Sequence, residues 1–108
     1  MKKSRAEVLD MTRAAVRLAR NYAEEIEFSA EDATRSDVNY LCDVLSVAVE
    51  EGATILNVPD TVGYTLPNEF TRLIRTVRER VVGERRDITI SVHCHNDLGL
   101  AVANTLAA

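Results

Sequence analysis

Residues 87–97 read DITISVHCHND, a run of β-branched residues that ends in a cluster of polar side chains. The first half is typical of a buried β-strand. His93 and His95 follow near its end, and residues two apart on a strand point to the same face. Both imidazoles are therefore predicted to reach one point in space. Cys94 should point the other way, into the layer between the sheet and its helices, where we interpret it as a packing residue.

Upstream of this strand, apolar residues recur at helical spacing in two segments that flank a short strand. Ser4 and Glu7 form a Ser-x-x-Glu capping box, which predicts the start of the first helix. The apolar face of that helix is predicted to comprise Val8, Met11, Ala15, Leu18 and Tyr22. A short strand is expected at 26–29. Ser36 or Asp37 is placed to cap a second helix, which ends at Gly52.

Two further units complete the pattern. Residues 53–58, ATILNV, predict a buried strand that closes at Pro59. Pro67 suits the first turn of a third helix, which Gly83 ends. The apolar face of this helix is predicted to comprise Phe70, Leu73, Ile74, Val77 and Val81. After the third strand, we prefer Asp97 as the cap of a fourth helix over 98–108.

The predicted order of elements, α-β-α-β-α-β-α, indicates an α/β fold with parallel strands and external helices. The corresponding positions Phe28, Val58 and His93 lie 30 and 35 residues apart. A (β/α)₈ TIM barrel of about 250 residues averages roughly 31 residues per unit, but an open doubly wound sheet fits this spacing equally well. The lack of a glycine-rich phosphate loop favours the barrel. We therefore expect one domain over 1–108, a partial (β/α)₈ TIM barrel of about three βα units with a leading helix.

Composition narrows the possible partners and the compartment. The formal net charge of −4 argues against a nucleic-acid partner held by phosphate contacts. No apolar run approaches the roughly 20 residues that a membrane-spanning helix needs, so no membrane partner is expected. The two cysteines, Cys42 and Cys94, are too few for a disulfide framework. Buried thiols in a reducing compartment are the simpler interpretation, and we expect a cytoplasmic protein.

Polar residues follow all three predicted strands, at the end where parallel α/β folds build their sites. His93 and His95 suit a divalent cation, although two hydrogen-bonded histidines would give the same pattern. A cation such as Mg²⁺ or Mn²⁺ prefers about six ligands, including oxygen donors, so further ligands must come from elsewhere. The second set of candidates comprises Glu31, Asp32, Asp60 and Thr61. These could bind substrate or serve as a base, or they could cap helices and order loops. For Asn96 both interpretations stay open.

Three motifs taken together resemble the 2-isopropylmalate synthase family. They are EFSAEDATRSD (27–37), NVPDTVGYTLP (57–67) and SVHCHNDLGLAVANTLAA (91–108). This family belongs to a superfamily of metal-dependent TIM barrels that includes homocitrate synthase, citramalate synthase and 3-hydroxy-3-methylglutaryl-CoA lyase. The resemblance runs over nearly the whole chain. It implies an internal fragment of a catalytic barrel, without the Asp-Arg-Glu strand, the asparagine-ligand strand or the regulatory domain of the family.

The resemblance also implies roles for particular residues. His93 and His95 would bind Mg²⁺ or Mn²⁺. Glu31 and Thr61 would be catalytic and substrate-binding residues, with Glu31 near the 2-oxo acid and Thr61 bound to its carboxylate. The implied reaction is the condensation of acetyl-CoA with 2-oxoisovalerate to 2-isopropylmalate and CoA, which is the first committed step of leucine biosynthesis. A homodimer is expected for the complete protein. Homocitrate or citramalate synthase, a metal-dependent lyase or aldolase, and a fragment without independent catalysis remain alternatives.

Overall fold

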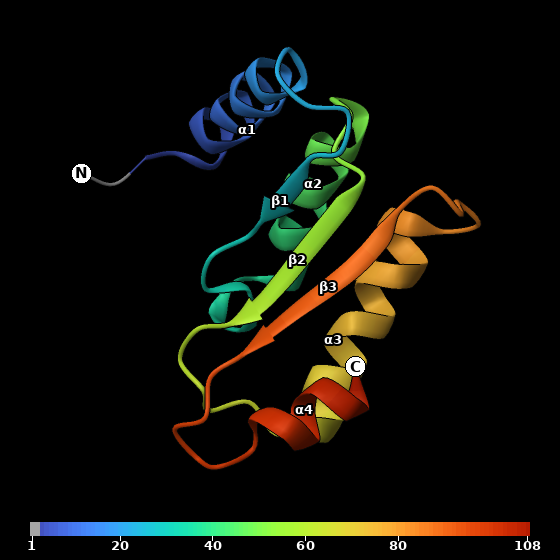
Figure 1. Ribbon diagram of the computed structural model, residues 1–108. Helices are drawn as coiled ribbons and strands as arrows, with labels where there is room; N and C mark the ends of the chain where they lie inside the picture. Colours follow the sequence, from blue (N-terminus) through green and yellow to red (C-terminus); the bar gives the residue numbers. More distant parts are fainter. Residues whose placement is uncertain (1–2) are drawn as a thin grey trace.

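Three parallel strands form one sheet in the order β1-β2-β3 (Figure 1). The computed structural model describes residues 3–108. The helices and strands are α1 (Arg5–Arg20), β1 (Glu27–Ser29), α2 (Val38–Glu50), β2 (Ile55–Asp60), α3 (Pro67–Val77), β3 (Thr89–Cys94) and α4 (Ala101–Ala107). Two short turns complete the chain, a 3₁₀ turn at Ala33–Arg35 and a π-helical turn at Arg78–Val82. The strand order follows the chain order, as in consecutive units of a barrel.

The core lies on one face of this sheet. Leu56 and Val58 of β2 are completely buried, and they belong to one apolar cluster with Leu45 of α2 and Phe70 of α3. The helices therefore cover the face of β2 that carries its even-numbered residues (Figure 1). Burying such side chains stabilises the fold by about 1.5–3 kcal/mol each.

The opposite face of the sheet is polar, and no helix formed by residues 3–108 covers it (Figure 1). Ser29, Asn57 and Ser91 pair in register across the three strands. The Ser29 hydroxyl donates to Asn57 Oδ1 at 2.9 Å, and Asn57 Nδ2 donates to Ser91 Oγ at 2.9 Å. A doubly wound sheet carries helices on both faces, whereas the inward face of a barrel carries none. Helices on a single face thus confirm the barrel-like arrangement expected from the sequence.

Local signals for helix ends are confirmed at several positions. The Ser4 hydroxyl accepts from the Glu7 N–H at 3.2 Å, and the Glu7 carboxylate accepts from the Ser4 N–H at 2.7 Å. Of the two candidates for the second cap, Asp37 is the one used, because its carboxylate accepts from the Tyr40 N–H. Gly52 follows α2 with a φ of +108°, a conformation that favours glycine.

The predicted buried face of α1 is wrong. Met11, Leu18 and Tyr22 are 52%, 59% and 83% exposed, whereas Thr12 and Val16 are buried. The helix packs mainly against α2, and this contact turns the Thr12 and Val16 side towards the core. Charged groups strengthen the same contact, since Arg17 Nη2 donates to Glu51 Oε1 at 2.8 Å. Among residues 3–108, no helix has the length and apolar character needed to span a bilayer.

The fourth helix begins later than expected, and Asp97 does not cap it. The helix starts at Ala101, whose N–H donates to Asn96 Oδ1 at 3.2 Å. Gly99 has a φ of +72°, so residues 97–100 turn before the helix can begin. Asp97 instead lies against the loop after β2, where its carboxylate occupies the space that a Cβ on Gly63 would need. The third strand, expected over 87–95, is shorter and runs from Thr89 to Cys94.

Candidate active site

An open hollow of about 440 Å³ lies on the polar face of the sheet at the carboxyl ends of the strands. Its lining residues are Ser29, Glu31, Asn57, Pro59, Thr61 and His93. Glu31 lies two residues after β1, Thr61 directly follows β2, and His93 is the partner of Pro59 in the register of β3 with β2. The structure therefore brings together three of the four residues expected at the site, and it draws them from all three strands.

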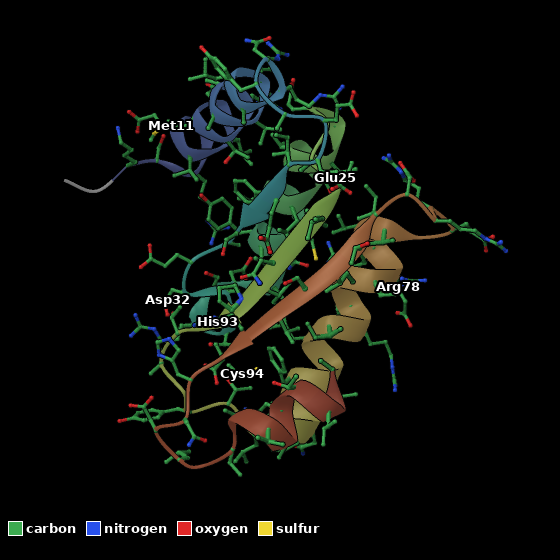
Figure 2. All side chains as sticks on the ribbon, in the orientation of Figure 1. Met11, Glu25, Asp32, Arg78, His93 and Cys94 are labelled. Atoms are coloured by element: carbon green, nitrogen blue, oxygen red, sulfur yellow. The ribbon has the colours of Figure 1, made fainter. Side chains whose placement is uncertain are left out.

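The fourth expected residue, His95, lies beside His93. The two ring centroids are 5.0 Å apart, and the rings meet edge to face at 65°. His95 extends the strand pairing by one step, because its N–H donates to the Asp60 carbonyl at 3.1 Å. Cys94 between them is partly buried and packs against the apolar core. Figure 2 labels His93 and Cys94 near the end of β3. The alternation predicted for these three residues is confirmed.

The two imidazoles would fit part of a divalent metal site. Both are exposed at the strand end, and neutral imidazole nitrogen is a common ligand for transition metals. Within residues 3–108 there is no group of three or more His, Cys, Asp or Glu side chains that could hold a metal ion. The described residues thus supply two nitrogen donors, and oxygen ligands would have to come from substrate, water or other parts of a longer protein.

Thr61 is oriented by a charged pair that follows β1. Its hydroxyl donates to Asp32 Oδ1 at 3.3 Å, and Arg35 Nε donates to both oxygens of the same carboxylate at 2.8 and 2.9 Å. The hydrogen bonds from Arg35 hold the pKa of Asp32 below its ordinary value, and the Thr61 hydroxyl acts in the same direction. Asp32 has a φ of +62°, which aspartate tolerates better than most residues. Asp32 therefore does not line the hollow, but it orients the Thr61 hydroxyl by accepting its hydrogen bond.

Asp60 has a structural role, which the sequence left open. Its side chain is fully buried and accepts hydrogen bonds from Thr34, Gly63 and Thr65. A buried carboxylate is tolerated only when it is hydrogen-bonded, and these three donors meet that need. Glu31 differs from it, because its side chain is exposed at the rim of the hollow.

Sequence reasoning missed the floor of the site. Ser29, Asn57 and Pro59 line the hollow together with the expected residues. The signal was present in the strand period, because Asn57 and Pro59 lie two residues apart on the face that also carries His93. No single one of these residue types points to a site, so only the register of the strands shows that they converge.

Parallel strands in chain order, helices on one face and a polar hollow at the carboxyl ends define this chain as part of a TIM-barrel protein. All of residues 1–108 match the HMGL-like family, and the chain belongs to this family.

Comparison with curated proteins identifies similar chains named 2-isopropylmalate synthase. The protein of Pelotomaculum thermopropionicum is 56% identical over 108 residues, which is 100% of this chain and 21% of the relative. That of Nitrobacter winogradskyi is 54% identical over 107 residues, 99% of this chain and 20% of the relative. That of Pyrococcus furiosus is 55% identical over 108 residues, 100% of this chain and 21% of the relative. The chain thus spans about a fifth of the length of these relatives.

Proposed function

We propose that this chain is part of the catalytic barrel of a 2-isopropylmalate synthase, which condenses acetyl-CoA with 2-oxoisovalerate to 2-isopropylmalate and CoA. The observation that carries the proposal is the convergence of Glu31, Thr61 and His93 in one hollow. An identity of 54–56% with proteins of that name, over 99% or more of the chain, supports the choice of reaction. Residues 1–108 would form a single partial domain of that barrel.

The roles proposed for the residues follow from where they lie. The Thr61 hydroxyl would donate a hydrogen bond to the carboxylate of the 2-oxo acid in place of Asp32, which accepts this hydrogen bond in the free chain. Glu31 would lie beside the oxo acid at the rim of the hollow. His93 and His95 would hold Mg²⁺ or Mn²⁺. When bound, that ion supplies Lewis-acid polarisation of the substrate ketone.

The polar floor of the hollow would help to keep the site open to a charged substrate. The Asn57 side chain is hydrogen-bonded to Ser29 on one side and to Ser91 on the other, so it is held in place before substrate enters. A group fixed in advance loses little entropy when a ligand binds.

Acetyl-CoA would be the second substrate. A homodimeric complete protein in the cytoplasm remains part of the proposal.

The test is a CoA-release assay on the complete protein that contains residues 1–108. It should be supplied with acetyl-CoA, Mg²⁺ or Mn²⁺, and in turn 2-oxoisovalerate, pyruvate and 2-oxoglutarate. We expect the highest kcat/KM with 2-oxoisovalerate. Glu31→Gln should lower this value by at least about tenfold, which corresponds to about 1.4 kcal/mol of lost transition-state stabilisation. Glu24→Gln is the matched control on an exposed loop remote from the hollow.

Two results would contradict the proposal. A clear preference for pyruvate would indicate citramalate synthase, and a clear preference for 2-oxoglutarate would indicate homocitrate synthase. Cleavage of a hydroxyacyl substrate without any CoA release from acetyl-CoA would instead place the protein among lyases.

A further inference from the structure

Asp60 is bonded to the segments that follow all three strands. Its Oδ1 accepts from the Thr34 hydroxyl at 3.0 Å, and Thr34 lies in the turn after β1. The same oxygen accepts from the Gly63 N–H at 3.2 Å, and Oδ2 accepts from the Thr65 N–H at 3.2 Å, both in the loop after β2. Its carbonyl accepts from the N–H of His95, which follows β3. One residue therefore joins the three segments that carry the proposed site residues.

The Asp60 side chain lies outside the hollow. Asp60 is 0% exposed, and it is not among the residues that line the hollow. Side chains alternate along a strand, so Asp60 points to the helix side, like Leu56 and Val58. Thr61, the next residue, lines the hollow. Asp60 can therefore influence a bound substrate only indirectly, through Thr61 and the other segments to which it is bonded.

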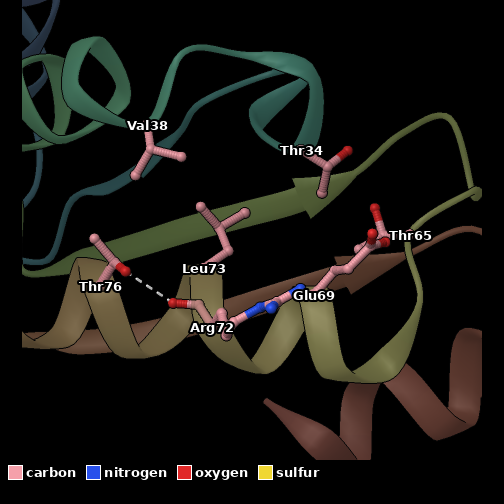
Figure 3. Close-up of a pocket in the computed structure, with 7 residues that line it drawn as sticks. All are labelled: Thr34, Val38, Thr65, Glu69, Arg72, Leu73 and Thr76. Carbon is pink, nitrogen blue, oxygen red and sulfur yellow. Dashed lines mark hydrogen bonds between the residues drawn. The ribbon is translucent and has the colours of Figure 1, made fainter.

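The loop held by Asp60 is also held from its other side. Thr65 donates its N–H to Asp60, and its carbonyl accepts from Nδ2 of the fully buried Asn104 of α4 at 2.8 Å. Figure 3 shows Thr34 and Thr65 from the outer side, where they line a groove beside the start of α3. Hydrogen bonds to a charged acceptor are roughly twice as strong as neutral ones. The carboxylate is thus the strongest single acceptor in this network.

We propose that Asp60 is a positioning residue, whose buried carboxylate fixes Thr61 relative to Glu31 and the two histidines. The inference rests on the proposed function, in which Thr61 binds the carboxylate of the 2-oxo acid. A shift of the 61–66 loop would misplace the Thr61 hydroxyl and weaken oxo-acid binding. A second substrate that does not contact Thr61 should bind as before.

Thr34 provides the sharpest test, because it contacts Asp60 and is not part of the proposed machinery. In the complete protein, Thr34→Val removes the hydroxyl donor while keeping the side-chain volume, and Thr34→Ser keeps the donor. Thr12→Val is the matched control, since Thr12 is a buried threonine of α1 whose hydroxyl donates to the Val8 carbonyl at 2.9 Å. Each variant is assayed for kcat and for KM with each substrate.

We expect Thr34→Val to raise the KM for the oxo acid by about tenfold, the effect of one lost hydrogen bond to a charged group, with little change in kcat. The KM for acetyl-CoA should stay near the wild-type value. Thr34→Ser and Thr12→Val should both resemble the wild type. Asp60→Asn replaces one carboxylate oxygen by an NH₂ group, which cannot accept from the backbone N–H of Gly63 or Thr65 that it then faces. This variant should also raise the KM for the oxo acid and leave the KM for acetyl-CoA near the wild-type value. Amide hydrogen exchange over residues 61–66 should be faster than in the wild type.

The outcomes separate the two proposals. If the complete wild-type protein is active and Thr34→Val behaves like Thr34→Ser and Thr12→Val, the positioning role is overturned while the proposed function stands. An equal rise in both KM values for Thr34→Val would also overturn it, because that is the result of general loosening. A wild-type protein that releases no CoA with any 2-oxo acid overturns the proposed function, and the positioning role with it.

Discussion

His93 and His95 lie on one face of the sheet, and Cys94 between them lies on the other. The histidines are exposed and their rings lie 5.0 Å apart, whereas Cys94 packs against the core. A cation bound at this strand end could contact both imidazoles. It could not contact the thiol without a change in strand register, which would also turn Ile90 and Val92 away from the helices.

In the complete protein, substitution of either histidine should therefore have a different effect from substitution of Cys94. His93→Ala and His95→Ala should each weaken Mn²⁺ binding by at least tenfold and reduce synthase activity to a similar or greater degree, since each removes one proposed ligand. Cys94→Ala should leave Mn²⁺ affinity within about twofold of the wild type, because the thiol lies on the other face. Calorimetric titration with Mn²⁺ measures all three. A Cys94 variant as impaired as the histidine variants would refute the assignment.

Asp32 and Arg35 make a second prediction at the scale of single residues. The pKa of Asp32 is lowered chiefly by its hydrogen bonds to Arg35. A folded-state pKa below the unfolded value means that the pair stabilises the fold above the unfolded pKa, and that this stability is lost as pH falls through the folded pKa. The side chains of Arg35 and Asp32 are 66% and 34% exposed, so solvent screens the pair and its contribution to stability is small.

Arg35→Gln should raise the pKa of Asp32 towards that of an ordinary aspartate. A carboxyl-carbon NMR titration of residues 1–108 would follow the change directly. Asp87 is the internal control, because its pKa is lowered by hydrogen bonds from Arg85 and does not depend on Arg35. An Asp32 pKa that stays low in Arg35→Gln would mean that Thr61 or the backbone is the main cause.

At the scale of the element, α1 illustrates how a helix can carry two apolar stripes. One stripe contains Thr12 and Val16 and faces the core, and the other contains Met11 and Leu18 and faces solvent. Tyr22, which is also exposed, lies just beyond the end of α1. Figure 2 labels Met11 on α1, at the outer edge of the molecule. Spacing identifies both stripes as helical, but only packing decides which one is buried.

Paired alanine substitutions should distinguish the two stripes. Val16→Ala removes two buried methyl groups and should lower the free energy of unfolding of residues 1–108 by about 2 kcal/mol. Leu18→Ala removes a larger side chain but should change stability by less than about 0.5 kcal/mol, because Leu18 is mostly exposed. Urea denaturation followed by circular dichroism, at protein concentrations too low for association, measures both. Equal losses would place Leu18 in the core and contradict the observed orientation of α1.

At the scale of the whole molecule, apolar side chains lie exposed on the two terminal helices. Leu98 precedes α4, and Val102 and Leu106 follow at spacings of four residues, with 53%, 73% and 83% of their surfaces exposed. Val102 and Leu106 lie on one side of α4, and Leu98 precedes them at the same spacing. The exposed apolar residues of α1 likewise lie on one side of that helix. In sheet order, β1 and β3 are the edge strands, and open edges favour pairing with further strands. A closed barrel covers these surfaces with neighbouring units.

Residues 1–108 expressed alone should therefore associate and show no measurable synthase activity. Association is expected from the open strand edges and apolar surfaces. Inactivity is expected because the described residues offer a metal two imidazoles and no group of three ligands. Light scattering over a concentration series and a CoA-release assay test both parts, and Val102→Glu should reduce association. A soluble monomer that releases CoA as fast as the complete protein would contradict the prediction.

Much of the fold could be predicted from the sequence because the relevant signals are local. The capping box at Ser4 and Glu7, the cap at Asp37 and the glycine after α2 all depend on residues within one turn. The alternation around Cys94 depends only on the strand period. Glu31, Thr61 and His93 could be expected at one edge for a related reason, since the carboxyl ends of parallel strands meet there.

The remaining features depend on contacts between residues distant in the sequence. Whether Met11 or Val16 is buried depends on α2, which begins 22 residues after Val16. Asn96 rather than Asp97 meets the N–H of Ala101 because the Gly99 turn places it there. Asp60 is a buried acceptor because Thr34 and Thr65 approach it from separate loops. The elements and the edge at which the polar residues gather could be predicted from the sequence, because helix and strand period and capping are local. Which of those side chains face the hollow and which hold the loops follows only from the folded chain, because it depends on burial and on the donors that reach each carboxylate.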